Sequence, residues 1–369
     1  MKKIGTLILL ILLLQGCSES NSADNGPEET TKTADPTLAT APASNSPKEI
    51  PSITLTSSTF HSVIGWLSND EILFILLEKG KWTVQSYSIS NDSWKTIYTS
   101  AIPIIEGFIH PNKELILLHT SNNSSSAEVQ IIHKNGYLEQ SLTFESAEIY
   151  MDWHPTNPDL IAFTTFYEDW SYNTFVYDGS TQNLQSIEAG NPFVKWYDDK
   201  QLMLLEGTDS NLDGNKLILY SLDDKTLKDT GINHLVDVQN LGDSMLYIQI
   251  NEDKKLYDYR LVNKEGKDSL EWTSPAISNY SEWVIPTISV VKPGQIITMK
   301  ALESGNVDES GDKGIISSIS LEGEREWGQV LFQPISCAPD GKTCLGGYEL
   351  ENWIQLNPLK EKVWIHLDE

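Results

Sequence analysis

One short segment of this sequence carries oxygen ligands at the spacing that calcium-binding loops use. Asp209, Asn211 and Asp213 alternate with other residues and are followed by a glycine, which allows the chain to turn. Alternating carboxylate and amide oxygens are the ligands that a hard cation such as Ca²⁺ takes in protein loops. The acid that usually closes such a loop is missing, because Leu217 and Tyr220 occupy the positions where it would stand. We expect either a weak calcium site or a solvated hairpin loop, and no other cofactor.

Cys17 has the sequence context of a lipid attachment site. Two lysines precede the apolar run from Ile4 to Leu14, which is too short to span a bilayer and is typical of a signal peptide. Gln15 and Gly16 then lead to the cysteine, as in the pattern at which lipoprotein processing attaches diacylglycerol and cleaves the chain. We therefore expect a lipoprotein signal peptide over residues 1–16 and a lipidated N-terminus at Cys17.

The other two cysteines, Cys337 and Cys344, flank the segment Ala-Pro-Asp-Gly-Lys-Thr. A two-residue Asp-Gly turn would place them directly opposite each other, within the distance of a disulfide. A type I turn with a glycine bulge would instead pair Cys337 with Thr343 and put Cys344 on the other face of the hairpin. The sequence leaves both alternatives open. A metal site is disfavoured, because no histidine or third cysteine is nearby.

A fourth group combines carboxylates with aromatic rings in segments that we predict to be loops. Exposed rings among carboxylates are typical of a recognition surface, whereas the rings of a core belong on strands. We expect some of these rings to pack between neighbouring elements instead. The predicted binding residues are Glu168, Asp169, Trp170, Tyr172, Asp253, Tyr280, Trp283 and Tyr348.

Common catalytic signatures are missing from the sequence. It has no Gly-x-Ser-x-Gly elbow, no His-Glu-x-x-His zinc motif and no glycine-rich phosphate loop. His110 and His154 each precede a proline at equivalent places in a repeat, which favours a role in turn packing over catalysis. An enzyme would become the better interpretation if two acids faced one cavity and one of them had a raised pKa.

Internal repetition predicts the elements that hold these groups. Short apolar runs on either side of a polar turn recur about every forty-odd residues, as in Trp66 to Leu73, Ile109 to Ile116, Trp153 to Ile161 and Trp196 to Leu202. Weaker copies follow at Val238, Val290 and Ser336, and each copy continues into two more short strands. Sheets of four antiparallel strands bury their faces only by stacking around an axis. We therefore predict an all-β protein, a β-propeller of four-stranded antiparallel blades, with seven blades favoured and six as the alternative.

The remaining composition divides the chain into three parts. Residues 17–50 consist mainly of Ser, Thr, Ala, Pro, Asn and Glu and have too few apolar side chains to fold, so they form a tether. Residues 51–369 have enough apolar residues for one domain, the propeller. The formal charge of −26 repels nucleic acid and anionic membrane surfaces. It could attract a basic partner, or it could simply keep the protein soluble.

The lipid attachment motif, the tether and the repeats together resemble the YqgU-like lipoproteins of Bacillus and its relatives. The stretch from Trp153-His-Pro to Phe163-Thr-Thr-Phe-Tyr-Glu-Asp-Trp170 is the most characteristic. The resemblance implies a β-propeller, described as six-bladed, on the extracytoplasmic face of the cell membrane, and it implies no established activity.

Two functions are compatible with these observations. We favour a non-enzymatic binding or scaffold module, anchored in the membrane by its lipid, that recognises a protein or a cell-wall component through the acidic and aromatic loops. The alternative is a cell-envelope hydrolase or lyase that acts on saccharide or peptide with carboxylates facing the central channel.

Overall fold

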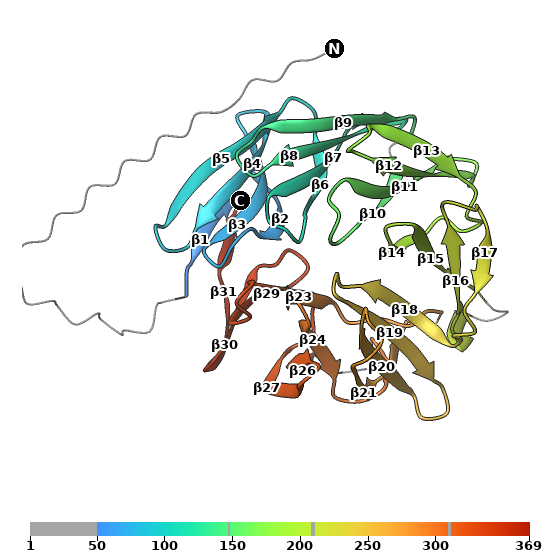
Figure 1. Cartoon of the computed structure of the whole chain (residues 1–369). Coiled ribbons are helices and arrows are strands. Elements are labelled where there is room, and N and C mark those ends of the chain that lie inside the picture. Colours follow the sequence, from blue (N-terminus) through green and yellow to red (C-terminus); the bar gives the residue numbers. More distant parts are fainter. Residues whose placement is uncertain (1–49, 147, 208–210, 280, 309–310) are drawn as a thin grey trace, which may run out of the picture. The chain divides into compact units, whose positions relative to one another are not determined.

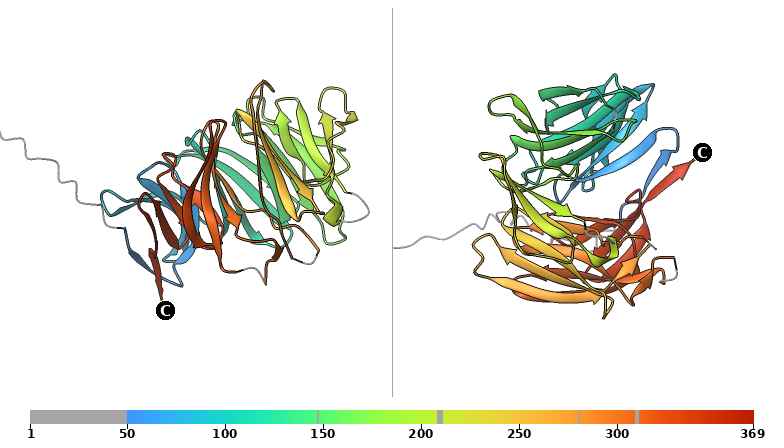
Figure 2. Two further views of the ribbon diagram at one scale, coloured as in Figure 1. Left: turned by 90° about the horizontal axis from the view of Figure 1, so that it is seen from below. Right: turned by 90° about the vertical axis from the view of Figure 1, so that its right-hand side faces the viewer.

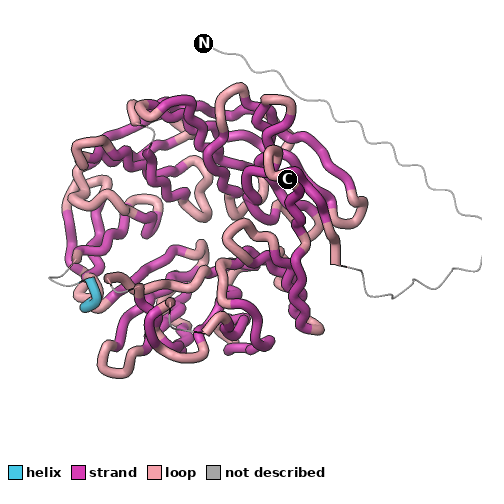
Figure 3. Tube along the Cα trace, turned by 180° about the vertical axis from the view of Figure 1, so that it is seen from behind, coloured by secondary structure: helices cyan, strands magenta, loops and turns pink. Residues whose placement is uncertain are grey.

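The structure is a computed structural model, and it describes residues 50–369 apart from 147, 208–210, 280 and 309–310. The predicted signal peptide, Cys17 and nearly all of the tether lie outside the described residues. The regular secondary structure of the described residues is strand, joined by loops and turns, apart from one 3-10 turn, η1 (Asn211–Asp213) (Figure 3). Among the described residues, no helix has the length and apolar character needed to cross a membrane.

Seven antiparallel sheets of four strands follow one another along the chain, and each uses strands that are consecutive within it (Figure 1). We number them as blades 1 to 7. Blade 1 consists of β2 (Phe60–Trp66), β3 (Glu71–Glu78), β4 (Lys81–Ser88) and β5 (Ser93–Ser100), and blade 2 consists of β6 (Ile104–Ile109), β7 (Leu115–Asn123), β8 (Ser126–His133) and β9 (Leu138–Phe144). Blade 3 consists of β10 (Glu148–Trp153), β11 (Leu160–Phe166), β12 (Tyr172–Asp178) and β13 (Asn183–Ile187). Blade 4 consists of β14 (Lys195–Asp198), β15 (Gln201–Glu206), β16 (Lys216–Ser221) and β17 (Leu227–Asp229). Blade 5 consists of β18 (Leu235–Asn240), β19 (Ser244–Asn251), β20 (Leu256–Asn263) and β21 (Ser269–Pro275). Blade 6 consists of β23 (Ile288–Lys292), β24 (Gln295–Ala301), β26 (Lys313–Ser320) and β27 (Gly323–Leu331). Blade 7 consists of β28 (Ile335–Cys337), β29 (Thr343–Gly346), β30 (Asn352–Leu356) and β31 (Leu359–Val363).

The hydrophobic core is divided into seven clusters, and each cluster lies between two neighbouring blades. Leu73 and Ile75 of blade 1, for example, pack with Ile116 and Leu118 of blade 2. The same arrangement is repeated for every following pair. A small sheet that buries both faces against neighbours needs apolar residues on both faces of its middle strands, which explains runs such as Ile72–Leu76 in β3.

The seventh cluster closes the ring between blades 7 and 1. It contains Trp353 and Trp364 from the C-terminal end of the chain and Trp66 and Phe74 from blade 1. The indole nitrogen of Trp66 also donates a hydrogen bond to the carbonyl of Ser336 at 2.9 Å. These contacts confirm the propeller and the count of seven blades among the described residues.

The two ends of the described chain meet without sharing a blade. β1 (Ile53–Thr56) pairs in parallel with β32 (Ile365–Asp368), so the terminal strands form a separate two-stranded ribbon (Figure 2). A second small ribbon, β22 (Ile277–Ser278) with β25 (Gly305–Asn306), lies beside blade 6. All four strands of each blade therefore come from one continuous stretch of chain, and the ring is closed by the packing between blades 7 and 1 and by the pairing of β1 with β32.

The alternation of strand direction divides the loops between two faces. Loops from second to third strands emerge on the same face as the segments that link one blade to the next, and we call this side the connector face. Loops from first to second and from third to fourth strands emerge on the opposite face. The first strand of each blade lies nearest the centre of the ring, and the fourth lies at its rim (Figure 1).

Candidate functional site on the connector face

The loop between β11 and β12 holds Trp170 in an unusual and exposed position. The backbone N–H of Trp170 donates to the carbonyl of Tyr167 at 2.9 Å, and Tyr167 N–H donates to Ser171 at 3.0 Å, which closes a tight turn. Trp170 has φ of 66°, in the left-handed region that favours glycine, and its side chain is 94 % exposed. A large residue that is both strained and fully exposed is a candidate for recognition.

The strands and the link beside the Trp170 turn carry a row of four aromatic rings, which we call the aromatic row: Tyr150, Phe166, Tyr172 and Phe193. Phe166 and Tyr172 are paired across β11 and β12, with ring centroids 6.5 Å apart. Phe193, from the link between blades 3 and 4, lies 5.7 Å from Phe166 and 5.5 Å from Tyr150. Phe193 is 56 % exposed and Tyr172 37 %, so the row offers ring surface to solvent.

The carboxylates around the aromatic row are exposed and unbalanced by bases. Glu148 is paired with Phe166 in the sheet, and Glu168 and Asp169 stand in the turn before Trp170. The hydroxyl of Ser171 donates to the Asp169 carboxylate, which lowers the pKa of that group and keeps it ionised. This region therefore presents negative charge directly beside exposed rings.

A cavity of about 280 Å³ opens beside the aromatic row because β14 is short. β14 has four residues, whereas β10 and β18, the first strands on either side, have six each. Part of β15 is therefore left uncovered on the connector side, and Met203, Leu204 and Leu205 line the cavity together with Phe193. An apolar cavity next to exposed rings can receive one side chain or one small group of a ligand.

The first strands of blades 3, 4 and 5 carry a charged residue at equivalent places, namely Asp152, Lys195 and Asp237. The Lys195 ammonium donates to Asp237 at 2.6 Å, so these two charges are paired. Asp152 accepts a hydrogen bond from the backbone N–H of Trp196 at 2.7 Å. Burial raises the pKa of Asp152 to about 6, although that hydrogen bond and Lys195 oppose the shift. Asp152 and Lys195 line a second cavity of about 220 Å³.

The structure brings together four of the predicted binding residues, Glu168, Asp169, Trp170 and Tyr172, on blade 3. Tyr348 is 90 % exposed and belongs to the connector face, but on blade 7. Asp253 lies on blade 5, in a hollow of about 420 Å³ that it shares with Glu252 and His234.

Trp283 and Tyr280 complete the predicted set. The indole nitrogen of Trp283 donates to the carbonyl of Leu212 at 2.9 Å, and its ring packs against Tyr257. Trp283 therefore ties loops of different blades together instead of offering a free ring. Tyr280 lies outside the described residues.

The predicted calcium loop is only partly described. Asp209 lies outside the described residues, and Asn211 and Asp213 belong to the turn η1. The carbonyl of Asp213 lies 3.1 Å from Nδ1 of His234, so it accepts a hydrogen bond when that nitrogen carries the proton. In the part of the chain that the structure describes, no three His, Cys, Asp or Glu side chains are grouped as metal ligands would be. Calcium binding at Asp209 stays a prediction.

Cys337 and Cys344 stand directly opposite each other on β28 and β29, and a disulfide joins them. The hairpin combines features of both predicted turns. Gly341 has φ of 64° and its N–H donates to Ala338, as in a type I turn followed by a left-handed glycine. The loop has one residue more than a type I turn with a glycine bulge needs. The strands therefore pair in the same register as they would around a two-residue turn, and the two cysteines face each other.

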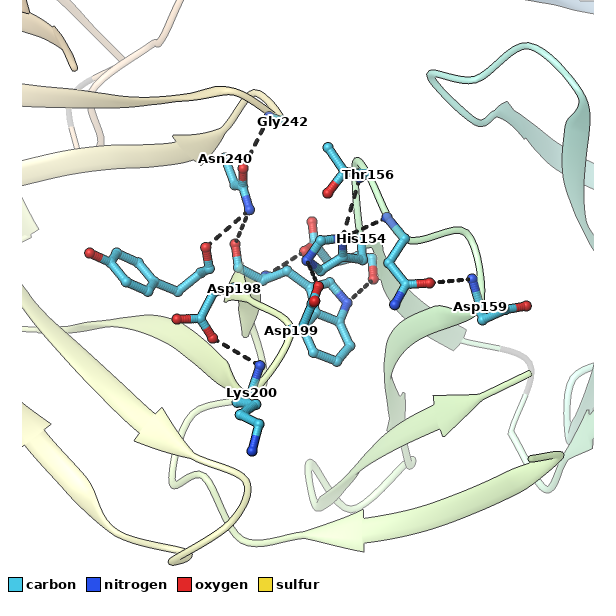
Figure 4. Close-up of polar contacts among 12 residues, drawn as sticks. His154, Thr156, Asp159, Asp198, Asp199, Lys200, Asn240 and Gly242 are labelled. Carbon is cyan, nitrogen blue, oxygen red and sulfur yellow. Dashed lines mark hydrogen bonds and ion pairs between the residues drawn. The ribbon is translucent and has the colours of Figure 1, made fainter. Parts of the chain in front are cut away.

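Histidines on the opposite face have structural roles. His154 is buried, its Nδ1 accepts the backbone N–H of Asn157 at 2.9 Å, and Nε2 lies 3.2 Å from the carboxylate of Asp199 (Figure 4). His110 bonds the carbonyl of His154 at 3.0 Å and so links blade 2 to blade 3. Burial lowers the pKa of both rings, which favours neutral imidazoles. These contacts agree with the expected role in turn packing.

Sequence reasoning missed Phe193 and the charged residues at the channel. Phe193 stands in a link between blades, where Pro192 and Asn191 signal only a turn. Asp152, Lys195 and Asp237 each stand immediately before the apolar residue that marks a repeat. Reading across the aligned repeats for charged residues at one position could have found them.

Comparison with known proteins gives one family. Residues 88–347 match the model of the YqgU-like 6-bladed beta propeller domain. The uncharacterized lipoprotein YqgU of Bacillus subtilis (strain 168) is 21 % identical over 314 residues, which cover 81 % of this chain and 82 % of that protein. The family description counts six blades, whereas the described residues here form seven four-stranded sheets.

Two solved structures have the same fold. The uncharacterized protein lmo1340 from Listeria monocytogenes EGD-e is 20 % identical, with a TM-score of 0.78, over 87 % of this chain and 98 % of that one. The β-propeller domain of the Trilobed protease from Pyrococcus furiosus is 10 % identical, with a TM-score of 0.54, over 84 % of this chain and 100 % of that one. At these identities the likeness concerns the fold alone.

Proposed function

The chain belongs to the YqgU-like β-propeller family, and from this membership and the geometry of the connector face we propose that it is a membrane-anchored binding module. The module recognises a protein or a cell-wall component outside the cytoplasm. Its anchor is the lipid expected at Cys17, in line with a relative that is named a lipoprotein. The tether over residues 17–50 lets the propeller reach partners at a distance from the membrane.

The observation that carries this proposal is the exposure of Trp170 in a conformation that favours glycine. A tryptophan contributes nothing to folding when its ring is in solvent, and the left-handed conformation costs about 1 kcal/mol or more. Aromatic residues of this kind dominate the energy of protein interfaces. The aromatic row and the cavity beside β14 extend the surface on which a partner would rest.

Photo-crosslinking in intact cells tests the proposal. A photoreactive phenylalanine analogue is placed at Trp170 or Tyr348 on the connector face, and at Tyr137 as a control. Tyr137 is 65 % exposed in a loop of the opposite face, so it is a matched aromatic position. We expect discrete crosslinked products from Trp170 and none of the same mass from Tyr137. Identical product patterns from the two faces would refute the connector face as the binding surface.

One observation favours the alternative, a cell-envelope hydrolase or lyase, although Asp152 has no second acid beside it among the described residues that line its cavity. The pKa of Asp152, about 6, is suitable for a general acid near neutral pH, and Asp152 lines a cavity. An enzyme should release soluble fragments from purified cell wall, and Asp152→Asn should slow the release by about 100-fold, the usual contribution of a general acid. A binding module should release none, with either the wild type or the variant.

A further inference from the structure

The segment from residue 135 to residue 194 has no lysine or arginine, although the whole chain has 26. The same segment holds nine acidic residues and comprises the last strand of blade 2, all of blade 3 and the links on either side of blade 3. A stretch of this length without lysine or arginine leaves its carboxylates without a permanent positive charge nearby in the sequence. The charge of the molecule is therefore concentrated at this blade as well as being negative overall.

Four of these carboxylates are exposed on the connector side of blade 3, namely Glu148, Glu168, Asp169 and Glu188. Glu148 begins β10, Glu168 and Asp169 stand in the turn before Trp170, and Glu188 follows β13 directly. The exposed rings of Trp170, Tyr172 and Phe193 stand on the same side, in the loop between β11 and β12, at the start of β12 and in the link to blade 4. Blade 3 thus presents rings and negative charge on one surface.

A cation is the group that uses both features at once. The face of an aromatic ring attracts ammonium and guanidinium groups, and neighbouring carboxylates add Coulomb attraction. An uncharged glycan would use the rings but would gain nothing from the absence of bases. An anionic wall polymer would be repelled by the carboxylates.

We propose that the connector edge of blade 3 binds a basic segment of another protein, with Lys or Arg side chains placed over the exposed rings. This inference rests on the proposed function and names the class of its partner. The pairs that form are exposed to solvent, so the binding weakens as salt concentration rises.

The test uses the full chain in detergent micelles and three fluorescent probes: an oligolysine, an oligoglutamate of the same length and an uncharged oligomer of N-acetylglucosamine. Affinity is measured by fluorescence anisotropy. In the local variant, Glu148, Glu168 and Glu188 are all replaced by Gln. In the control variant, Asp224→Asn, Glu322→Gln and Glu369→Gln remove the same charge from exposed acids elsewhere on the molecule.

We expect oligolysine to bind the wild type, the local variant to bind it about tenfold more weakly, and the control variant to stay within about twofold. Oligoglutamate should not bind. Equal losses in both variants would overturn the proposal, because the attraction would then come from overall charge.

Two further results separate this inference from the proposed function. If the uncharged oligomer binds through Trp170 and oligolysine does not, the cationic partner is wrong while the connector face remains the binding surface. If no probe binds and Trp170 also yields no specific crosslinks in cells, both proposals fail.

Discussion

At the scale of single residues, a substitution of Trp170 should change binding with little effect on stability. Because its φ of 66° favours glycine, Trp170→Gly relieves backbone strain while it removes the exposed ring. The free energy of unfolding should therefore fall by no more than about 1 kcal/mol, or should rise, because relief of strain opposes the entropy of the unfolded glycine chain. Crosslinking from the analogue at Tyr348 and probe binding should be lost. Urea denaturation and anisotropy measure the two effects.

Lys255→Gly is the matched control for this prediction. Lys255 has φ of 52° and stands at the same place in the equivalent loop of blade 5, where its N–H donates to Glu252 at 3.2 Å. Its replacement should alter stability to a similar extent and leave binding intact. Loss of binding in both variants would show that the loops matter only for the fold.

Asp152 gives a prediction that depends on pH. Its folded pKa of about 6 lies above the value of about 3.9 expected in the unfolded chain. Ionising Asp152 in the folded state therefore lowers the free energy of unfolding. This loss of stability is absent below about pH 4, grows up to about pH 6 and is complete above that. Asp152→Asn should raise the free energy of unfolding by roughly 3 kcal/mol at pH 8 and leave it unchanged at pH 4. An equal effect at both pH values would contradict the assignment.

The exposure of a predicted binding residue could be foreseen where the residue has a local signal. Trp170 stands in a polar segment between two strands, so its exposure follows from the pattern. Trp283 stands in a similar segment, but its indole finds an acceptor at Leu212, on another blade. A contact between residues so distant in sequence cannot be predicted from the residues around either of them.

At the scale of elements, the four-strand unit could be predicted because its strands alternate apolar and polar residues between clear turns. The small ribbon of β22 and β25 could not, since each strand has two residues and too short a pattern. The cavity beside β14 depends on where that strand begins, and a strand boundary depends on hydrogen bonds to β15. The sequence therefore predicts the four-stranded blade but not the cavity beside β14.

The loop between β15 and β16 is the element on which calcium binding is predicted. Three alternating oxygen ligands before a glycine could hold one cation, and a site in the ~0.1 to 1 mM range would stabilise the fold by about 1 to 2 kcal/mol under moderate excess. Calcium should raise the melting temperature of the wild type but not that of Asp209→Ala. Melting curves of the wild type that are the same in calcium and in chelator would show an ordinary hairpin loop.

For the whole molecule, the seven clusters between blades predict one cooperative unit. Removing residues 332–369 deletes blade 7 and β32, which exposes the apolar faces of blades 6 and 1. The truncated chain should not fold, as judged by the loss of a cooperative melting transition. Removing only residues 365–369 is the milder control and should lower the melting temperature while the ring persists. An unchanged transition after the larger deletion would refute closure by packing.

The central claim is that the connector face is occupied by a partner outside the cytoplasm, and cysteine labelling in intact cells tests it most directly. Ser171→Cys, which keeps the ring of Trp170 beside the exposed new thiol, and Tyr137→Cys are treated with a maleimide that does not cross membranes, before and after a wash with high salt. We predict that the cysteine at 137 reacts at once, and that the cysteine at 171 reacts only after salt has removed a basic partner. If neither reacts until the cells are lysed, the location is wrong. If both react equally before the wash, the connector face is free and the account is contradicted.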